Sequence, residues 1–175
     1  MNEGDAIKEL RKSTGAPILD CRKVLKECGG DTEKARVILK EKGFAKAQRL
    51  ESRSANQGAV ASYIHHDGKT GALVEINCET DFVAKNEIFK ALAKEVTLQI
   101  VACSPLYVAR ENVPQDGVAK VPENEREDFY KTSCLLEQPS IRDAAVSIGD
   151  LIKEAMSKLG ENIVVKRFIR YKVGE

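Results

Sequence analysis

Aromatic residues and long apolar runs are scarce in this chain of 175 residues. Tryptophan is absent, aromatic residues make up 5% of the chain, and apolar residues as a whole make up 42%. The apolar runs fall far short of the roughly 20 residues that cross a membrane, and no apolar signal segment follows Met1. We therefore expect a soluble protein with an aliphatic core, folded as one domain or two small ones, with no membrane partner.

A charge excess is missing as well. Lys and Arg number 28 against 27 Asp and Glu, which leaves a net charge of +1. A net charge this close to zero creates no overall electrostatic attraction to nucleic acid, so no direct nucleic-acid partner is expected. Basic residues do gather on the first two expected helices, as a solvated face or as a surface for an acidic partner. They are Lys8, Arg11, Lys12, Arg22, Lys23 and Lys26.

Signals for a disulfide, metal or catalytic framework are absent. The five cysteines are odd in number, scattered and never spaced as CxxC, which predicts buried, reduced thiols in a cytosol-like compartment. His65 and His66 are the two histidines, and no cluster of Asp, Glu or Cys lies at metal-ligand spacing beside them, which predicts surface residues at a hairpin end. Glycine-rich phosphate loops and nucleophile elbows do not occur. We expect no metal, no cofactor and no covalent chemistry.

Residues 1–43 predict a module of three short helices, too small to be more than marginally stable alone. Gly15 is expected to end the first helix, and Pro17 to open the second, which ends at Gly29-Gly30. Asp31 is a cap for the third helix, which Gly43 is expected to end. Residues 44–55 lack a turn signal and predict a helical, charged linker.

Residues 56–175 predict a second domain of the α+β class, with an antiparallel sheet packed on helices. Strand-like runs at 58–65 and 71–78 flank Asp67-Gly68, a strong hairpin signal. An apolar stripe predicts a helix over 87–103, and residues 163–173 alternate throughout as a closing strand. Further expected elements are a short edge strand at 106–108, a loop at 111–124, and helices over 125–136 and from Ser147 to Lys158, the latter opened by Ser147 and Asp150 as a capping box.

The segment between the second strand and the 87–103 helix joins an acid to an aromatic residue, Asp81-Phe82. One interpretation is ordinary: Asp81 caps the following helix and Phe82 fills the core beneath it. The other is that Phe82 projects as an apolar wedge for a partner protein. Thr80 or Asn86 could serve as the cap instead, so the residues alone leave both interpretations open.

Several blocks of the sequence resemble the elongation factor Ts family, the nucleotide exchange factors of elongation factor Tu. The opening block runs from Arg11 to Ala16 and continues with Asp20-Cys21-Arg22-Lys23. The central block is residues 74–86, which contains Thr80-Asp81-Phe82-Val83. Later blocks are residues 134–139 and 160–163, followed by Arg167-Phe168. They occur in the family's order and span nearly the whole chain.

The resemblance implies an N-terminal domain of the ubiquitin-associated type, a core domain of the dimerisation type, and a guanine nucleotide exchange factor acting in translation. It implies no enzyme chemistry: the protein would bind elongation factor Tu with GDP, dislodge Mg²⁺ and let GDP leave, so that GTP can bind. Thr80, Asp81, Phe82 and Val83 would form the wedge, and Arg11, Ile18 and Leu19 would dock the partner. A cytoplasmic location follows, in a bacterial cytosol or an organelle matrix.

The chain also departs from the family pattern. It is short, with room for one core unit, and resembles the compact members in which a homodimer forms a two-plus-two complex. Ser140 stands where an aromatic residue is usual, and Pro17-Ile18-Leu19 replaces a Gly and Met pair. The rival hypotheses are an adaptor or RNA-binding module without exchange activity and, more weakly, a cysteine- or histidine-dependent enzyme.

Overall fold

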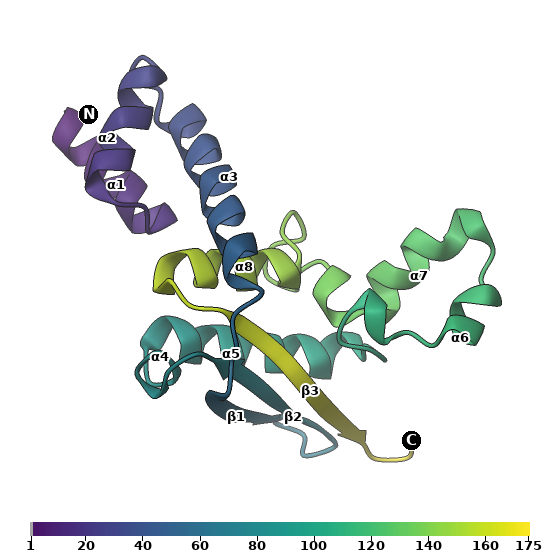
Figure 1. Cartoon of the computed structure of the whole chain (residues 1–175). Coiled ribbons are helices and arrows are strands. Elements are labelled where there is room, and N and C mark those ends of the chain that lie inside the picture. The colour runs from purple at the N-terminus through teal and green to yellow at the C-terminus, as the bar shows by residue number, and fades with distance from the viewer. Residues whose placement is uncertain (1) are drawn as a thin grey trace. The chain divides into compact units, whose positions relative to one another are not determined.

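A computed structural model describes residues 2–175 and divides the chain into two compact units (Figure 1). The first unit contains the residues up to 53 together with Lys153–Asn162. The second contains Ser54–Ile152 and Ile163–Glu175.

The first unit begins with three helices that share one aliphatic core. They are α1 (Glu3–Thr14), α2 (Ile18–Glu27) and α3 (Thr32–Leu50). Asn2 caps α1, and Gly15 ends the helix in the left-handed conformation at φ 71°. The end at Gly15 is the one that the sequence predicts. Asp31 caps α3 by accepting hydrogen bonds from the Glu33 and Lys34 amides. The core of the three helices contains Ala6, Ile7, Leu10, Cys21, Val24, Leu25, Ala35 and Leu39.

The third helix is longer than the sequence predicts. The prediction that it ends at Gly43 is wrong, because α3 continues through Gly43 to Leu50. A Cβ atom at Gly43 would lie 2.8 Å from the Ser157 hydroxyl oxygen. Glycine therefore serves here to let α3 approach the C-terminal part of another helix, α8, rather than to end α3.

Helix α8 (Ile148–Leu159) opens with the predicted capping box. The Ser147 hydroxyl accepts from the Asp150 amide at 3.0 Å, and the Asp150 carboxylate accepts from the Ser147 amide at 3.3 Å. Its C-terminal part belongs to the first unit, where Glu154 pairs with Lys40 at 2.6 Å. The buried Asn162 that follows α8 donates to the carbonyl of Arg53 at 2.7 Å.

The second unit is built on a three-stranded antiparallel sheet in the order β1-β2-β3. The strands are β1 (Gln57–Ile64), β2 (Thr70–Cys78) and β3 (Ile163–Lys172). The predicted hairpin at Asp67-Gly68 is confirmed, and Gly68 has φ 68°. Gly58 lies against β2 so closely that a Cβ atom would overlap the Ile76 carbonyl oxygen. The predicted α+β class is confirmed.

Helix α5 (Glu87–Cys103) packs against β1 and β2 and defines the inner face of the sheet. Its predicted stripe is buried, from Phe89 to Ile100. The predicted unbroken alternation of the last strand is wrong, because the register shifts between Glu75 and Ile76 of β2, where they pair with Arg167 and Val165. The bulge places Arg167, Ile169 and Tyr171 on the outer face, while Phe168 turns inward opposite the buried Val74.

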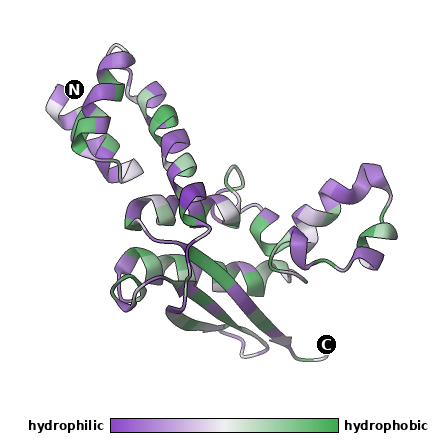
Figure 2. Ribbon diagram, viewed as in Figure 1, coloured by the Kyte–Doolittle hydropathy of each residue, from purple (hydrophilic) through white to green (hydrophobic). Residues whose placement is uncertain are grey.

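The segment between α5 and α8 forms an irregular arm, which is largely hydrophilic along α7 (Figure 2). The predicted edge strand at 106–108 is wrong: Tyr107 makes an isolated bridge to Cys134. The predicted loop at 111–124 contains the short helix α6 (Gln115–Ala119), and the predicted helix at 125–136 is the shorter α7 (Arg126–Ser133). Three 3-10 turns complete the arm: Arg110–Asn112, Glu123–Glu125 and Leu135–Glu137.

Arg110 stabilises this arm. Its guanidinium pairs with Glu127 at 2.8 Å and with Glu137 at 2.7 Å, and it lies 4.7 Å over the Tyr130 ring. The pairing lowers the pKa of Glu127 and raises that of Arg110. Such a network holds segments together that share little apolar core.

Candidate partner-binding site

The acid-aromatic junction forms a projecting turn in the second unit. Residues Asp81–Ala84 make α4, a single helical turn between β2 and α5. Phe82 is 81% exposed, the largest exposed fraction among the large apolar side chains of the described residues. The interpretation of Phe82 as a core residue is therefore wrong, because the core under this turn is filled by Phe89 and Leu92 of α5.

The caps of this region differ from the ordinary interpretation. Thr80 caps α4, and its hydroxyl accepts from the Val83 amide at 3.4 Å. Asn86 caps α5, and its side chain accepts from the Ile88 amide at 2.8 Å. Asp81 is thus not the cap. The two caps, six residues apart, confine α4 to one turn and hold Phe82 on its exposed side.

Asp81 is paired within the turn. Its carboxylate accepts a hydrogen bond from Lys85 Nζ at 2.7 Å, and both side chains are exposed. This hydrogen bond and the lysine charge lower the pKa of Asp81. The carboxylate is therefore ionised at neutral pH, and the exposed pair is weak enough to open when a partner offers other contacts.

The three residues that the resemblance assigns to docking flank one connection in the first unit. Arg11 lies in the last turn of α1, and Ile18 and Leu19 open α2. All three are exposed, and Leu19 is 75% exposed. The apolar residues of α2 are divided, since Val24 and Leu25 are buried while Ile18 and Leu19 are exposed. Exposed apolar side chains and arginine are residue types that contribute strongly to protein-binding surfaces.

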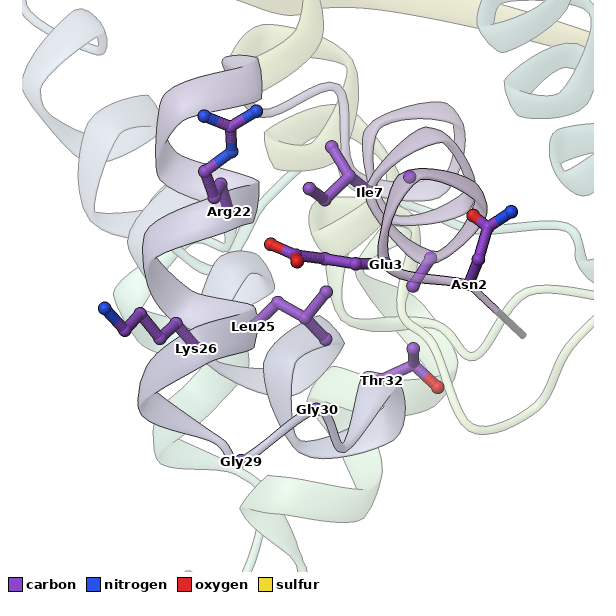
Figure 3. Close-up of a pocket in the computed structure, with 11 residues that line it drawn as sticks. Asn2, Glu3, Ile7, Arg22, Leu25, Lys26, Gly29, Gly30 and Thr32 are labelled. Carbon is purple, nitrogen blue, oxygen red and sulfur yellow. The ribbon is translucent and has the colours of Figure 1, made fainter.

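A hollow of about 1090 Å³ lies elsewhere in the first unit, between α1, α2 and the start of α3. Figure 3 shows Arg22 and Lys26 on α2 and Glu3 on α1 around it. Ile7 and Leu25 form part of its floor and are themselves buried. This hollow brings together part of the predicted basic group, but not Arg11, Ile18 or Leu19.

Across residues 2–175, no three His, Cys, Asp or Glu side chains come together as a metal site. His65 and His66 sit at the hairpin turn, with ring centroids 4.3 Å apart. Cys21, Cys78 and Cys134 are buried, Cys28 is partly buried and Cys103 is exposed. In the same span, no helix is long and apolar enough to cross a bilayer.

Comparisons with known proteins agree with the motif blocks. The family profile described as Elongation factor TS matches residues 32–128. Elongation factor Ts of Coprothermobacter proteolyticus is 46% identical over 190 residues, covering 97% of this chain and 96% of the relative. Elongation factor Ts of Leptospira biflexa is 47% identical with the same coverage, and that of Thermoanaerobacter sp. is 46% identical over 100% of this chain and 96% of the relative. The chain belongs to the elongation factor Ts family.

Membership makes the protein a translation elongation factor. The departure at Ser140 from the usual aromatic residue of the elongation factor Ts family is locally satisfied. Ser140 is 4% exposed, and its hydroxyl donates to Glu95 at 3.2 Å and accepts from the Arg142 amide at 3.2 Å. Next to it the buried Gln99 amide donates to Gln138 and accepts from the Ile141 amide. Hydrogen bonds therefore replace aromatic packing at this position.

The sequence does not single out one exposed apolar surface of the second unit. The outer sheet face, opposite α5, carries exposed apolar side chains from all three strands. Its central row is Ser62, Leu73 and Ile169, which are paired across the strands. Beside that row, the glycine at 71 leaves a hollow of about 650 Å³. The face comprises Val60, Ile64, Leu73, Ile169, Tyr171 and Val173. Only the register, including the bulge, reveals that these side chains share a face.

Proposed function

We propose that this protein is a guanine nucleotide exchange factor that binds elongation factor Tu with GDP, dislodges Mg²⁺ and promotes GDP release so that GTP can bind. The observation that carries the proposal is the exposed Phe82, capped on a short turn in a chain of the elongation factor Ts family. An isolated phenylalanine held in water has a cost that a partner's apolar pocket would recover.

The proposed activity needs binding alone and no covalent step. Suppose that a factor binds the nucleotide-free GTPase more tightly than the GDP-bound form. By linkage, it must then weaken the binding of GDP to the GTPase by the same factor. Mg²⁺ neutralises the charge of the β-phosphate, so displacing the ion weakens the binding of GDP most directly. The protein would therefore be no enzyme in the covalent sense, and it would work in the cytoplasm.

The turn supplies parts suited to that task. Phe82 would enter between helices of the GTPase domain, with Thr80 and Val83 setting its direction through their mutual hydrogen bond. Asp81 would leave Lys85 and compete for groups that order the magnesium and the phosphate. Opening the exposed Asp81–Lys85 pair costs little, since solvent screens such pairs.

The docking residues would hold the same partner. Arg11 would supply a charged anchor, and Ile18 and Leu19 an apolar one, which are the residue types that dominate protein interfaces. The near-zero net charge favours a protein partner over RNA. An adaptor without exchange activity would also use Phe82 as an anchor, and it differs in leaving the affinity of the partner for GDP unchanged.

Two copies would pair through the outer sheet face to give a two-plus-two complex. The face is apolar in its centre, with the Glu75–Arg167 ion pair at 2.7 Å on it. Homodimer interfaces are more apolar than ordinary protein surface and are usually related by a two-fold axis. A second copy would present the same apolar rows and could fill the hollow at Gly71.

A competition experiment tests the exchange proposal. The protein and nucleotide-free elongation factor Tu should co-elute in gel filtration, and GDP with Mg²⁺ should dissociate the complex. The apparent affinity of elongation factor Tu for GDP should fall by about 5- to 150-fold when the protein is added. ADP in place of GDP should not dissociate the complex. A complex that is equally stable with and without GDP would instead establish an adaptor.

A further inference from the structure

The Thr80 cap and contacts with β1 and β2 set part of the direction of the exposed turn. Helix α4 has four residues and buries none of them. The Asp81–Lys85 pair is exposed, and exposed pairs hold geometry weakly. If the turn were loosely held, ordering it on binding would cost conformational entropy, and this cost would reduce the affinity of the wedge for its partner.

A buried thiol lies beneath this turn. Cys78 is the last residue of β2 and is 0% exposed. Its backbone is paired on both sides, with Gln57 of β1 and with Ile163 of β3, so its position is set by the centre of the sheet. The thiol donates a hydrogen bond to the Thr80 carbonyl oxygen, with sulfur and oxygen 3.1 Å apart.

That carbonyl belongs to the cap of α4. The same oxygen accepts the Ala84 amide at 3.3 Å, which is a hydrogen bond that closes the helical turn. The thiol therefore binds the oxygen on which the turn is built, one residue away from Asp81. A rotation of this peptide group would turn the following helical residues, Phe82 among them.

We propose that Cys78 is a positioning residue for the wedge, holding Phe82 in its binding direction through the thiol contact to the Thr80 carbonyl. The proposal rests on the exchange function proposed above. Burial by itself would explain a small apolar residue at 78, but not a sulfur directed at this oxygen. Cys134 provides the comparison, because it is equally buried in the same unit and its sulfur has no hydrogen bond within residues 2–175.

Three variants separate the thiol contact from packing. Cys78→Val replaces the thiol by an apolar side chain without a donor, Cys78→Ser keeps a donor, and Cys134→Val makes the same change in size and polarity at the other buried thiol. Release of fluorescent GDP from elongation factor Tu is measured at limiting and saturating factor. Deuterium exchange of the Val83 and Ala84 amides is measured in the factor alone.

We expect Cys78→Val to slow GDP release about two- to fivefold at limiting factor, the range a weak S–H hydrogen bond supports, and to speed deuterium exchange at Ala84. Cys78→Ser should restore both toward wild type, and Cys134→Val should change neither. Wild-type rates and protection in Cys78→Val, or equal losses in all three variants, would overturn the proposal. If the wild-type protein releases no GDP, the exchange function fails, while the amide protection still decides whether the thiol orders the turn.

Discussion

Replacing Phe82 by alanine should slow GDP release from elongation factor Tu by about 10- to 100-fold, because truncating an interface hot spot costs about 2 kcal/mol or more. The fold should be unaffected. Phe82 is 81% exposed, so its truncation leaves no cavity in the core and removes little packing. Stopped-flow release of fluorescent GDP measures the rate, and calorimetry measures the thermal transition.

The control for this variant is Val37→Ala. Val37 is also exposed and apolar, at 57%, but it lies on α3, away from the wedge and from Arg11, Ile18 and Leu19 in the sequence. The Val37→Ala variant should release GDP from elongation factor Tu at the wild-type rate. If Phe82→Ala lost its cooperative thermal transition, Phe82 would have to be a core residue. If the exchange rate were unchanged, Phe82 would not act as a wedge.

Leu73→Lys should convert the proposed dimer to single chains. Leu73 lies in the central row of the outer sheet face, between Ser62 and Ile169. In a symmetric pair each chain would bring one unpaired charge to the buried interface, which costs several kcal/mol and weakens association by about 100-fold or more. Light scattering after gel filtration should then report the single-chain mass of 19.3 kDa.

Leu106→Lys is the matched control, because Leu106 is 69% exposed and lies outside the outer sheet face. It should leave the pair intact. If the pair forms the active surface, Leu73→Lys should also reduce exchange per chain. A wild-type protein that is monomeric at micromolar concentration would contradict the role of this face, as would a Leu73→Lys variant that remains paired.

The elements that the sequence predicted well carry their signals locally. Asp67-Gly68 specifies the hairpin, the stripe from Phe89 to Ile100 specifies α5, and Ser147 with Asp150 specifies the start of α8. In each case neighbouring residues determine the backbone and tertiary contacts only reinforce it. Such elements can be predicted from a few residues.

The failures come from contacts between distant segments. Gly43 is a helix-ending signal by itself, but its role depends on Ser157, more than 100 positions away in the chain. The bulge opposite Glu75 and Ile76 reverses which residues of β3 face outward, and alternation alone does not reveal it. The arm around Arg110 is ordered by ion pairs rather than by an apolar pattern.

The candidate site was predicted in part. The motif around Phe82 stood out in the sequence, but its exposure depends on Thr80 and Asn86 capping two separate helices. Capping preferences allow Thr80, Asp81 and Asn86 alike, so the sequence alone does not say which of them caps a helix. The contact of Cys78 with the turn was not foreseeable, because a buried cysteine at a strand end ordinarily serves as a small apolar residue.

Release of fluorescent GDP from elongation factor Tu across a magnesium series tests the central claim most directly. If the factor acts by displacing Mg²⁺, its acceleration should be largest at millimolar Mg²⁺ and should shrink as chelation removes the ion, because GDP then leaves quickly without help. An acceleration that is independent of Mg²⁺, or no acceleration at any concentration, would contradict the account.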